Sequence, residues 1–249
     1  MATVISFANQ KGGVGKTTSV FNVGASLASR GYRVLMIDLD PQASLTIYTG
    51  LEPYDYENSI VDVLKNPKQD ISKCVVSIRE KLSIIPSRIE LASAESELLG
   101  RPARELTLAR AISGIKDDYD YILIDCPPQL STLTINALAC TDKVIIPCKT
   151  DYLAYRGLEA LDETLATVKT YFKPDIESLG VLATMYDARV ADDKDLLNFY
   201  KEKYKVIGVI KRTAQAKKGL YDGLSSVEFM PHSEIAKEYE RVVDLIISK

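Results

Sequence analysis

The stretch NQKGGVGKTT, residues 9–18, lies between an apolar run at Thr3–Ala8 and a helical pattern at Lys16–Ser29. Its glycines let backbone N–H groups turn inward around phosphate oxygens, and the helix that follows directs its positive N-terminus at the same anion. A strand, a glycine-rich loop and a helix in this order are typical of a phosphate-binding loop, or P-loop. The sequence therefore predicts that the chain binds ATP through residues 11–18.

Different loop residues are expected to bind the phosphates and the Mg²⁺ of a magnesium nucleotide. We expect Lys16 to reach the β- and γ-phosphates and the Thr17 hydroxyl to ligate Mg²⁺. The common pattern GxxxxGK[ST] would place glycine at position 10, where this chain has Gln10, and a second lysine follows as Lys11. The residues predicted to contact the nucleotide are Lys11, Gly12, Gly13, Val14, Gly15, Lys16, Thr17 and Thr18.

Carboxylates follow two further apolar runs. Asp38 and Asp40 stand at the end of Arg33–Leu39, and Asp125 closes Tyr121–Asp125. An aspartate that ends a buried strand next to a P-loop is the pattern that holds Mg²⁺, directly or through water. We therefore predict Thr17 and Asp125 around the metal, and Asp38 stands at the same edge of the sheet. For Asp38, a loop or capping role is the alternative.

Short apolar runs alternate with helical patterns along the whole chain, which predicts right-handed βαβ units and a parallel sheet. We expect a three-layer α/β fold of the P-loop NTPase type, with a mostly parallel twisted sheet flanked by helices, as one domain over residues 1–249. The expected strands are Thr3–Ala8, Arg33–Leu39, Leu82–Pro86, Tyr121–Asp125, Lys143–Cys148, Leu179–Met185 and Val206–Ile210. The expected helices are Lys16–Ser29, Ala103–Ile115, Ser131–Ala139, Arg156–Tyr171, Asp192–Lys203 and Ser233–Ile247. The segment Thr49–Lys81 is predicted as an insertion of short helices and loops.

Three motifs together resemble the ParA/MinD family of deviant Walker A ATPases. They are KGGVGKTT at residues 11–18, DLDPQ at 38–42 and IDCPP at 124–128. The resemblance implies that Lys11 is the family's signature lysine, which reaches across a dimer interface to the phosphates of the other subunit. It also implies that Asp40 orients the attacking water and that Asp38 lies near Mg²⁺ and Lys16. The catalytic residues expected from it are Lys11, Lys16 and Asp40.

The resemblance also suggests sites beyond the phosphates. It places the adenine beside the ends of the last two strands, where Met185, Asp187 and Lys211 are candidates; core packing is the alternative for Met185. The stretch 201–218 carries seven basic residues and one acidic residue, and such a patch can contact a phosphate backbone without reading bases. Relatives bind DNA through this region, so Lys211, Lys217 and Lys218 are the candidate DNA contacts. The sequence departs from the family here, because TAQAKKGLYDGLSSVEF stands where a VRLSEAPS-like segment is usual.

Composition limits the cellular setting. A net charge of −3 gives no global basicity, so any nucleic-acid site must be local. The four cysteines form no CxxC pair, which favours reduced thiols in a cytosolic protein, and Cys126 is expected to be a small buried residue. The N-terminus has no basic region before its short apolar run, and no run approaches a membrane span. We expect a cytoplasmic, nucleoid-associated protein of the small type, without an N-terminal operator-binding domain.

The favoured function is a partition ATPase that uses ATP and Mg²⁺, dimerises when ATP is bound, and binds double-stranded DNA without sequence preference. A ParB-type partner would stimulate hydrolysis. The alternative is a MinD-like ATPase that cycles on a membrane or positions a protein cargo. That alternative needs a basic amphipathic C-terminal helix, whereas Ser233–Lys249 is not basic. An iron–sulfur electron carrier would need a second cysteine within Arg88–Arg101, and this stretch has none. A metabolic P-loop kinase would give Lys11 no role.

Overall fold

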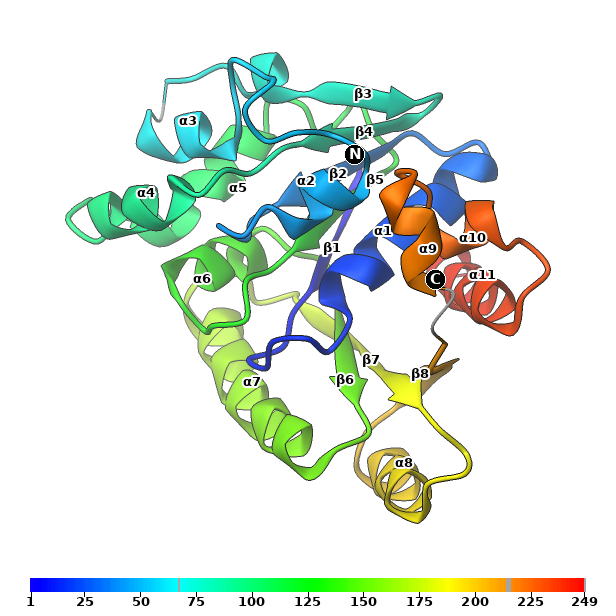
Figure 1. Ribbon diagram of the computed structural model, residues 1–249. Coiled ribbons are helices and arrows are strands. Elements are labelled where there is room, and N and C mark those ends of the chain that lie inside the picture. The colour runs from blue at the N-terminus through cyan, green and yellow to red at the C-terminus, as the bar shows by residue number, and fades with distance from the viewer. Residues whose placement is uncertain (67, 214–215, 249) are drawn as a thin grey trace.

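The computed structural model describes residues 1–66, 68–213 and 216–248, without the side chains of residues 153, 216 and 217. Within these residues, eight strands form one sheet, and helices cover both of its faces (Figure 1). The strands are β1 (Thr3–Phe7), β2 (Val34–Asp38), β3 (Val76–Arg79), β4 (Leu82–Ile85), β5 (Tyr121–Asp125), β6 (Lys143–Lys149), β7 (Glu177–Tyr186) and β8 (Val206–Lys211). The predicted α/β sheet is confirmed.

The strand order places the P-loop near the middle of the sheet. The order is β3-β4-β2-β5-β1-β6-β7-β8, and every described pairing is parallel except β3 with β4. From β1 the chain crosses to β2 on one side, and from β5 it crosses to β6 on the other. The carboxyl ends of β1, β2 and β5 therefore meet at a switch point, where ligands bind in sheets of this kind.

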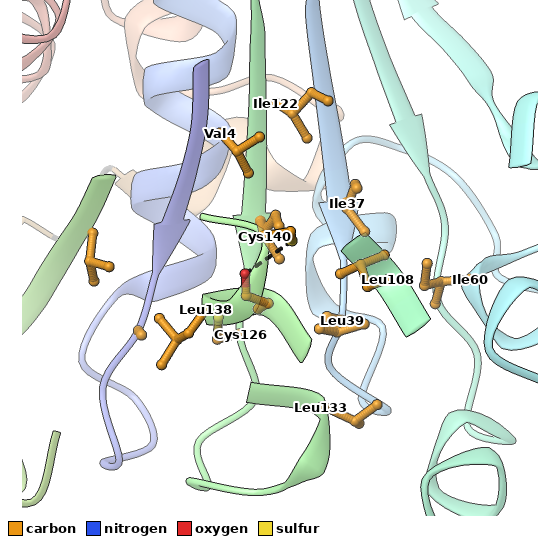
Figure 2. Packing of buried hydrophobic residues seen from close by; sticks show 14 of the residues in the cluster. Val4, Ile37, Leu39, Ile60, Leu108, Ile122, Cys126, Leu133, Leu138 and Cys140 are labelled. Carbon is orange, nitrogen blue, oxygen red and sulfur yellow. Dashed lines mark hydrogen bonds between the residues drawn. The ribbon is translucent and has the colours of Figure 1, made fainter. Parts of the chain in front are cut away.

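Both faces of the sheet are buried, as parallel strands require. Along β2, Leu35 and Ile37 pack into one apolar cluster and Met36 packs into the other. Figure 2 shows part of the first cluster, in which Cys126 and Cys140 lie among aliphatic side chains. The predicted burial of Cys126 is confirmed, and burial raises the pKa of the Cys140 thiol to about 12.

The helices form the two outer layers. On one face, α1 packs against α11, and Arg30, directly after α1, pairs with Asp244 of α11 at 2.6 Å. The helices are α1 (Lys16–Ser29), α2 (Ser44–Tyr48), α3 (Ile60–Lys65), α4 (Leu91–Leu98), α5 (Thr107–Ile112), α6 (Thr132–Ala139), α7 (Tyr152–Tyr171), α8 (Ala191–Lys203), α9 (Ala216–Tyr221), α10 (Ser226–Phe229) and α11 (Glu234–Ile247), with 3₁₀ turns η1 (Ile71–Cys74) and η2 (Arg104–Leu106). The bounds of α1 agree with the sequence prediction, whereas α7 begins four residues earlier than predicted because Asp151 caps it.

Two sequence expectations need correction. The insertion Thr49–Lys81 contains not only short helices but also strand β3, which extends the sheet antiparallel to β4. The helix expected at Ala103–Ile115 is shorter, because Ala103 adopts a left-handed φ of 50° before η2 and α5 ends at Ile112.

Candidate active site

The P-loop joins β1 to α1 through left-handed glycines. Gly13 has φ 69° and Gly15 has φ 86°, a region that side-chain-bearing residues rarely adopt. A Cβ on Gly13 would meet no atom within 4 Å, so the loop is open on that side. The Thr184 hydroxyl donates to the Val14 carbonyl at 2.8 Å and so fixes the loop to β7.

The loop borders a cavity of about 530 Å³. Most predicted site residues line it: Gly12, Gly13, Gly15, Lys16, Thr17, Thr18, Asp40, Met185 and Lys211. Lys11, Val14, Asp38, Asp125 and Asp187 do not. The cavity is thus bounded by the P-loop on one side and by the ends of β7 and β8 on the other.

Lys16 is almost fully enclosed, with 6% of its surface exposed. Its ammonium donates to the carbonyls of Asn9 at 3.2 Å and Lys11 at 3.1 Å, so it bridges the two ends of its own loop. Burial lowers the pKa of Lys16, while the negative charges of Asp125 and Asp40 oppose that shift. A buried cation that donates its hydrogen bonds to neutral carbonyls is well placed to accept an anionic ligand.

Asp125 is the second buried charge at the site. Both of its carboxylate oxygens are buried without a hydrogen-bond partner. Burial, followed by the neighbouring charge of Asp38, raises its pKa well above the usual range. The Thr17 hydroxyl and the charge of Lys16 oppose this shift, but a fully enclosed carboxylate is still costly, and a bound cation would relieve that cost.

Asp38 lies directly beside Asp125 in the pairing of β2 with β5, but its oxygens are occupied. One accepts from the Thr46 backbone N–H and hydroxyl, both at 2.8 Å, and the other accepts from the Asp40 N–H at 3.2 Å. Burial raises the pKa of Asp38 to about 6, against these hydrogen bonds. In this arrangement Asp38 holds the loop from Asp40 to Thr46, which is the alternative role that the sequence left open.

Asp40 begins that loop and lines the cavity. Its carboxylate accepts from the Gln42 N–H at 2.9 Å, and its carbonyl accepts from the Ser87 hydroxyl at 2.8 Å. The backbone is therefore fixed on both sides, while the carboxylate remains at the cavity wall. A carboxylate in this position can align a water molecule with a phosphate in the cavity.

Lys11 lies outside the cavity lining and contacts residues that the sequence analysis missed. Its ammonium donates to Asp151 Oδ1 at 2.6 Å, and its backbone N–H donates to Asn9 Oδ1 at 3.0 Å. Asn9 also donates to the Pro147 carbonyl at 2.8 Å, which ties the loop to β6. The position of Asn9 directly before the P-loop could have suggested this role, but nothing local in the sequence links Asp151 to Lys11.

On the base side, two of the three predicted residues line the cavity. Met185 has a left-handed φ of 54°, and Lys211 is 3.8 Å from Glu234. Asp187 instead pairs with Arg189 at 2.7 Å, and the hydrogen bonds from Arg189 hold its pKa well below the usual range. Among the DNA candidates, Lys218 is exposed, and the side chain of Lys217 lies outside the described residues.

Comparison with known proteins agrees with this geometry. Residues 2–178 match the protein family described as an AAA domain. The sporulation initiation inhibitor protein Soj of Bacillus subtilis is 40% identical over 244 residues, which is 96% of this chain and 96% of Soj. The chain belongs to the ParA/Soj family of P-loop ATPases.

Solved structures extend the comparison to the whole fold. The crystal structure of cobyrinic acid a,c-diamide synthase from Mycobacterium smegmatis, with bound ATP analog and magnesium, has a TM-score of 0.87 at 35% identity and covers 99% of this chain and 95% of that one. A putative plasmid partition protein from Borrelia burgdorferi bound to AMPPNP has a TM-score of 0.85 at 26% identity, covering 100% of this chain and 99% of that one. The ParA/Soj fold therefore extends along the whole chain.

The residues present in this ParA/Soj family member fit ATP with Mg²⁺. No group of three or more His, Cys, Asp or Glu that could hold a metal occurs in the described part of the chain. Mg²⁺ bound with a nucleotide needs few protein ligands, because phosphate oxygens and waters complete its shell. The Asp125 carboxylate, whose oxygens are buried, and the Thr17 hydroxyl, which lines the cavity, provide such a small set of metal ligands.

Proposed function

We propose that this chain is a partition ATPase that dimerises when ATP is bound, associates with the nucleoid by binding DNA without sequence preference, and responds to a ParB-type partner. The single observation that carries the proposal is the second lysine of the P-loop. Lys16 already occupies the phosphate side of the cavity, whereas Lys11 projects outside it, with 31% of its side chain exposed. A second cation at the rim is suited to the phosphates of another subunit.

Hydrolysis follows from the positions of the chain's own side chains. Lys16 neutralises negative charge on the β- and γ-phosphates. Asp40 orients a water for in-line attack on the γ-phosphate. Bound Mg²⁺ would add Lewis-acid stabilisation of the phosphate oxygens, held by Thr17 and Asp125. Lys11 adds its charge from the partner subunit, so the chemistry is coupled to dimerisation.

The membrane-cycling alternative has less support from the C-terminal helix. The apolar residues of α11 are buried, and the helix packs against β8 and α1. Its apolar face is therefore engaged within the protein and not offered to a lipid surface. Among the described residues, none of the helices is both long and apolar enough to span a membrane.

The proposal is tested by binding to random-sequence duplex DNA with ATP, with ADP and without nucleotide, across a salt series. Asp40→Ala should retain ATP and so accumulate the DNA-binding dimer, whereas Lys11→Ala should bind nucleotide but remain monomeric. We expect binding that requires ATP, weakens with salt and is stronger in Asp40→Ala. No DNA binding in any nucleotide state would reject the DNA part of the proposal, and ATP-driven dimerisation of Lys11→Ala would reject the trans-acting lysine.

Hydrolysis should be measured with no corrinoid and no amide donor present. One similar structure is named as an amide-forming synthase, so the substrate requirement separates the two activities. A partition ATPase should release phosphate slowly from ATP alone. An absolute requirement for a corrinoid acid would favour the synthase.

A further inference from the structure

The contact between Lys11 and Asp151 joins the P-loop to the start of α7. The two side chains are 2.6 Å apart, with 31% and 27% of their side-chain surfaces exposed. Asp151 Oδ1 also accepts from the Ala154 N–H at 2.7 Å and so caps α7, and Lys149 lies 3.3 Å from Oδ2. Although burial opposes the shift, hydrogen bonds from Lys11, Ala154 and Lys149 lower the pKa of Asp151. The carboxylate is therefore charged at neutral pH and attracts Lys11.

The backbone of Lys11 is fixed independently of this pair. Its N–H donates to Asn9, and its carbonyl accepts from Lys16. Gly157 of α7 approaches the same place, since a Cβ there would lie 2.9 Å from Asn9 Oδ1. Only the side chain of Lys11 is then free to change partner, while the loop that holds the nucleotide keeps its shape.

A buried tyrosine from a distant helix fixes the position of Asp151. Tyr200 of α8 is fully buried, and its hydroxyl donates to the Lys149 carbonyl at 2.8 Å and lies 3.4 Å from the Asp151 carbonyl. The Asp151 N–H also donates to the Lys149 carbonyl at 2.8 Å. These hydrogen bonds hold the short turn between β6 and α7, and with it the direction of the Asp151 carboxylate.

We propose that Asp151 is a positioning residue that holds Lys11 within its own subunit until a second subunit and its ATP displace it, and that Tyr200 positions Asp151. The inference rests on the proposed ATP-dependent dimer. The contact with Asp151 holds the Lys11 ammonium on its own subunit, and we infer that it leaves this position to reach a phosphate of another subunit. In a two-fold dimer the Lys11–Asp151 ion pair breaks in both subunits. A stronger ion pair therefore makes the dimer weaker.

The test compares dimerisation of Asp151→Asn with that of the parent chain, both carrying Asp40→Ala so that ATP persists. Asparagine removes the charge but remains a good helix cap. A partly exposed ion pair changes an equilibrium constant by only about threefold. Because each subunit contributes one pair, removing both should lower the dimer dissociation constant about tenfold. We expect Asp151→Asn to dimerise about tenfold more tightly in sedimentation velocity.

Two further readouts distinguish retention of Lys11 from a general structural effect. The difference between the two proteins should shrink at high salt, because screening weakens the ion pair. Asp151→Glu restores the carboxylate and should return dimerisation toward the parent value. Tyr200→Phe should tighten the dimer less than Asp151→Asn, and should add nothing when combined with it, because both act on the same contact.

The outcomes separate this inference from the proposed function. If Lys11→Ala still dimerises with ATP, the trans-acting lysine of the proposed function fails, and this inference fails with it. If Lys11→Ala is monomeric but Asp151→Asn dimerises no more tightly than its parent, the retention of Lys11 is wrong while the proposed function stands. If Asp151→Asn stabilises the dimer even in a Lys11→Ala background, Asp151 acts through some other contact and the inference is also wrong.

Discussion

The phosphate side of the cavity contains buried charged groups, whereas the base side includes more exposed residues at the ends of β7 and β8. Lys16 is 6% exposed and both oxygens of Asp125 are buried without a partner. By contrast, 61% of the Lys211 side chain is exposed. Buried charge is the costly feature of this molecule, and it lies where the phosphates and metal are expected. The base side carries no comparable cost, so changes there should have smaller effects.

The largest expected effect is that of Lys16→Ala, which removes the buried cation of the phosphate side. Losing one preorganised charge from a water-excluded site reduces turnover by about 100-fold to 1,000-fold. We expect phosphate release to fall by at least about 100-fold, with an unchanged circular dichroism spectrum. Residual activity within tenfold of the parent would show that this side does not depend on its buried charge.

The phosphate side was also the more predictable part of the fold. The glycines, lysines and aspartates of residues 9–18, 38–40 and 125 are local signals, and most of the strands that carry them lie within a residue or two of their predicted bounds. The signals that were missed are weaker or longer in range. The alternation of Val76 and Ile78 could have indicated the edge strand β3, and Ser225 with Glu228 forms a capping box at α10.

The contact of Lys11 with Asp151 could not be predicted from sequence spacing, because 140 residues separate the two. It depends on β6 lying beside β1, which brings the start of α7 to the P-loop. The role of Asp38 is a similar case. The metal role of Asp38 stays a prediction, and its hydrogen bonds to Thr46, which hold the loop that carries Asp40, are contacts that the motif does not show.

A smaller effect is expected on the base side, where Met185→Ala and Asp187→Ala form a matched pair. Met185 lines the cavity and Asp187 does not. Met185→Ala removes apolar surface that would be buried against the base, so the KM for ATP should rise about fivefold to tenfold with kcat unchanged. Asp187→Ala should leave both constants near the parent values. Steady-state kinetics with ATP distinguishes them, and a larger KM change in Asp187→Ala would contradict the assignment of the base side.

The smallest expected effect concerns the exposed edge of the base side, where Lys211→Gln removes one charge. If Lys211 contacts a DNA phosphate in the proposed dimer, its loss should lower the slope of log affinity against log salt by about 0.9, and weaken binding equally for all sequences. Lys169→Gln, on the exposed side of α7, is the matched control and should leave the slope unchanged. Equal slopes for both variants would remove Lys211 from the DNA surface. A changed KM for ATP in Lys211→Gln would instead assign its charge to the cavity, and so to the nucleotide.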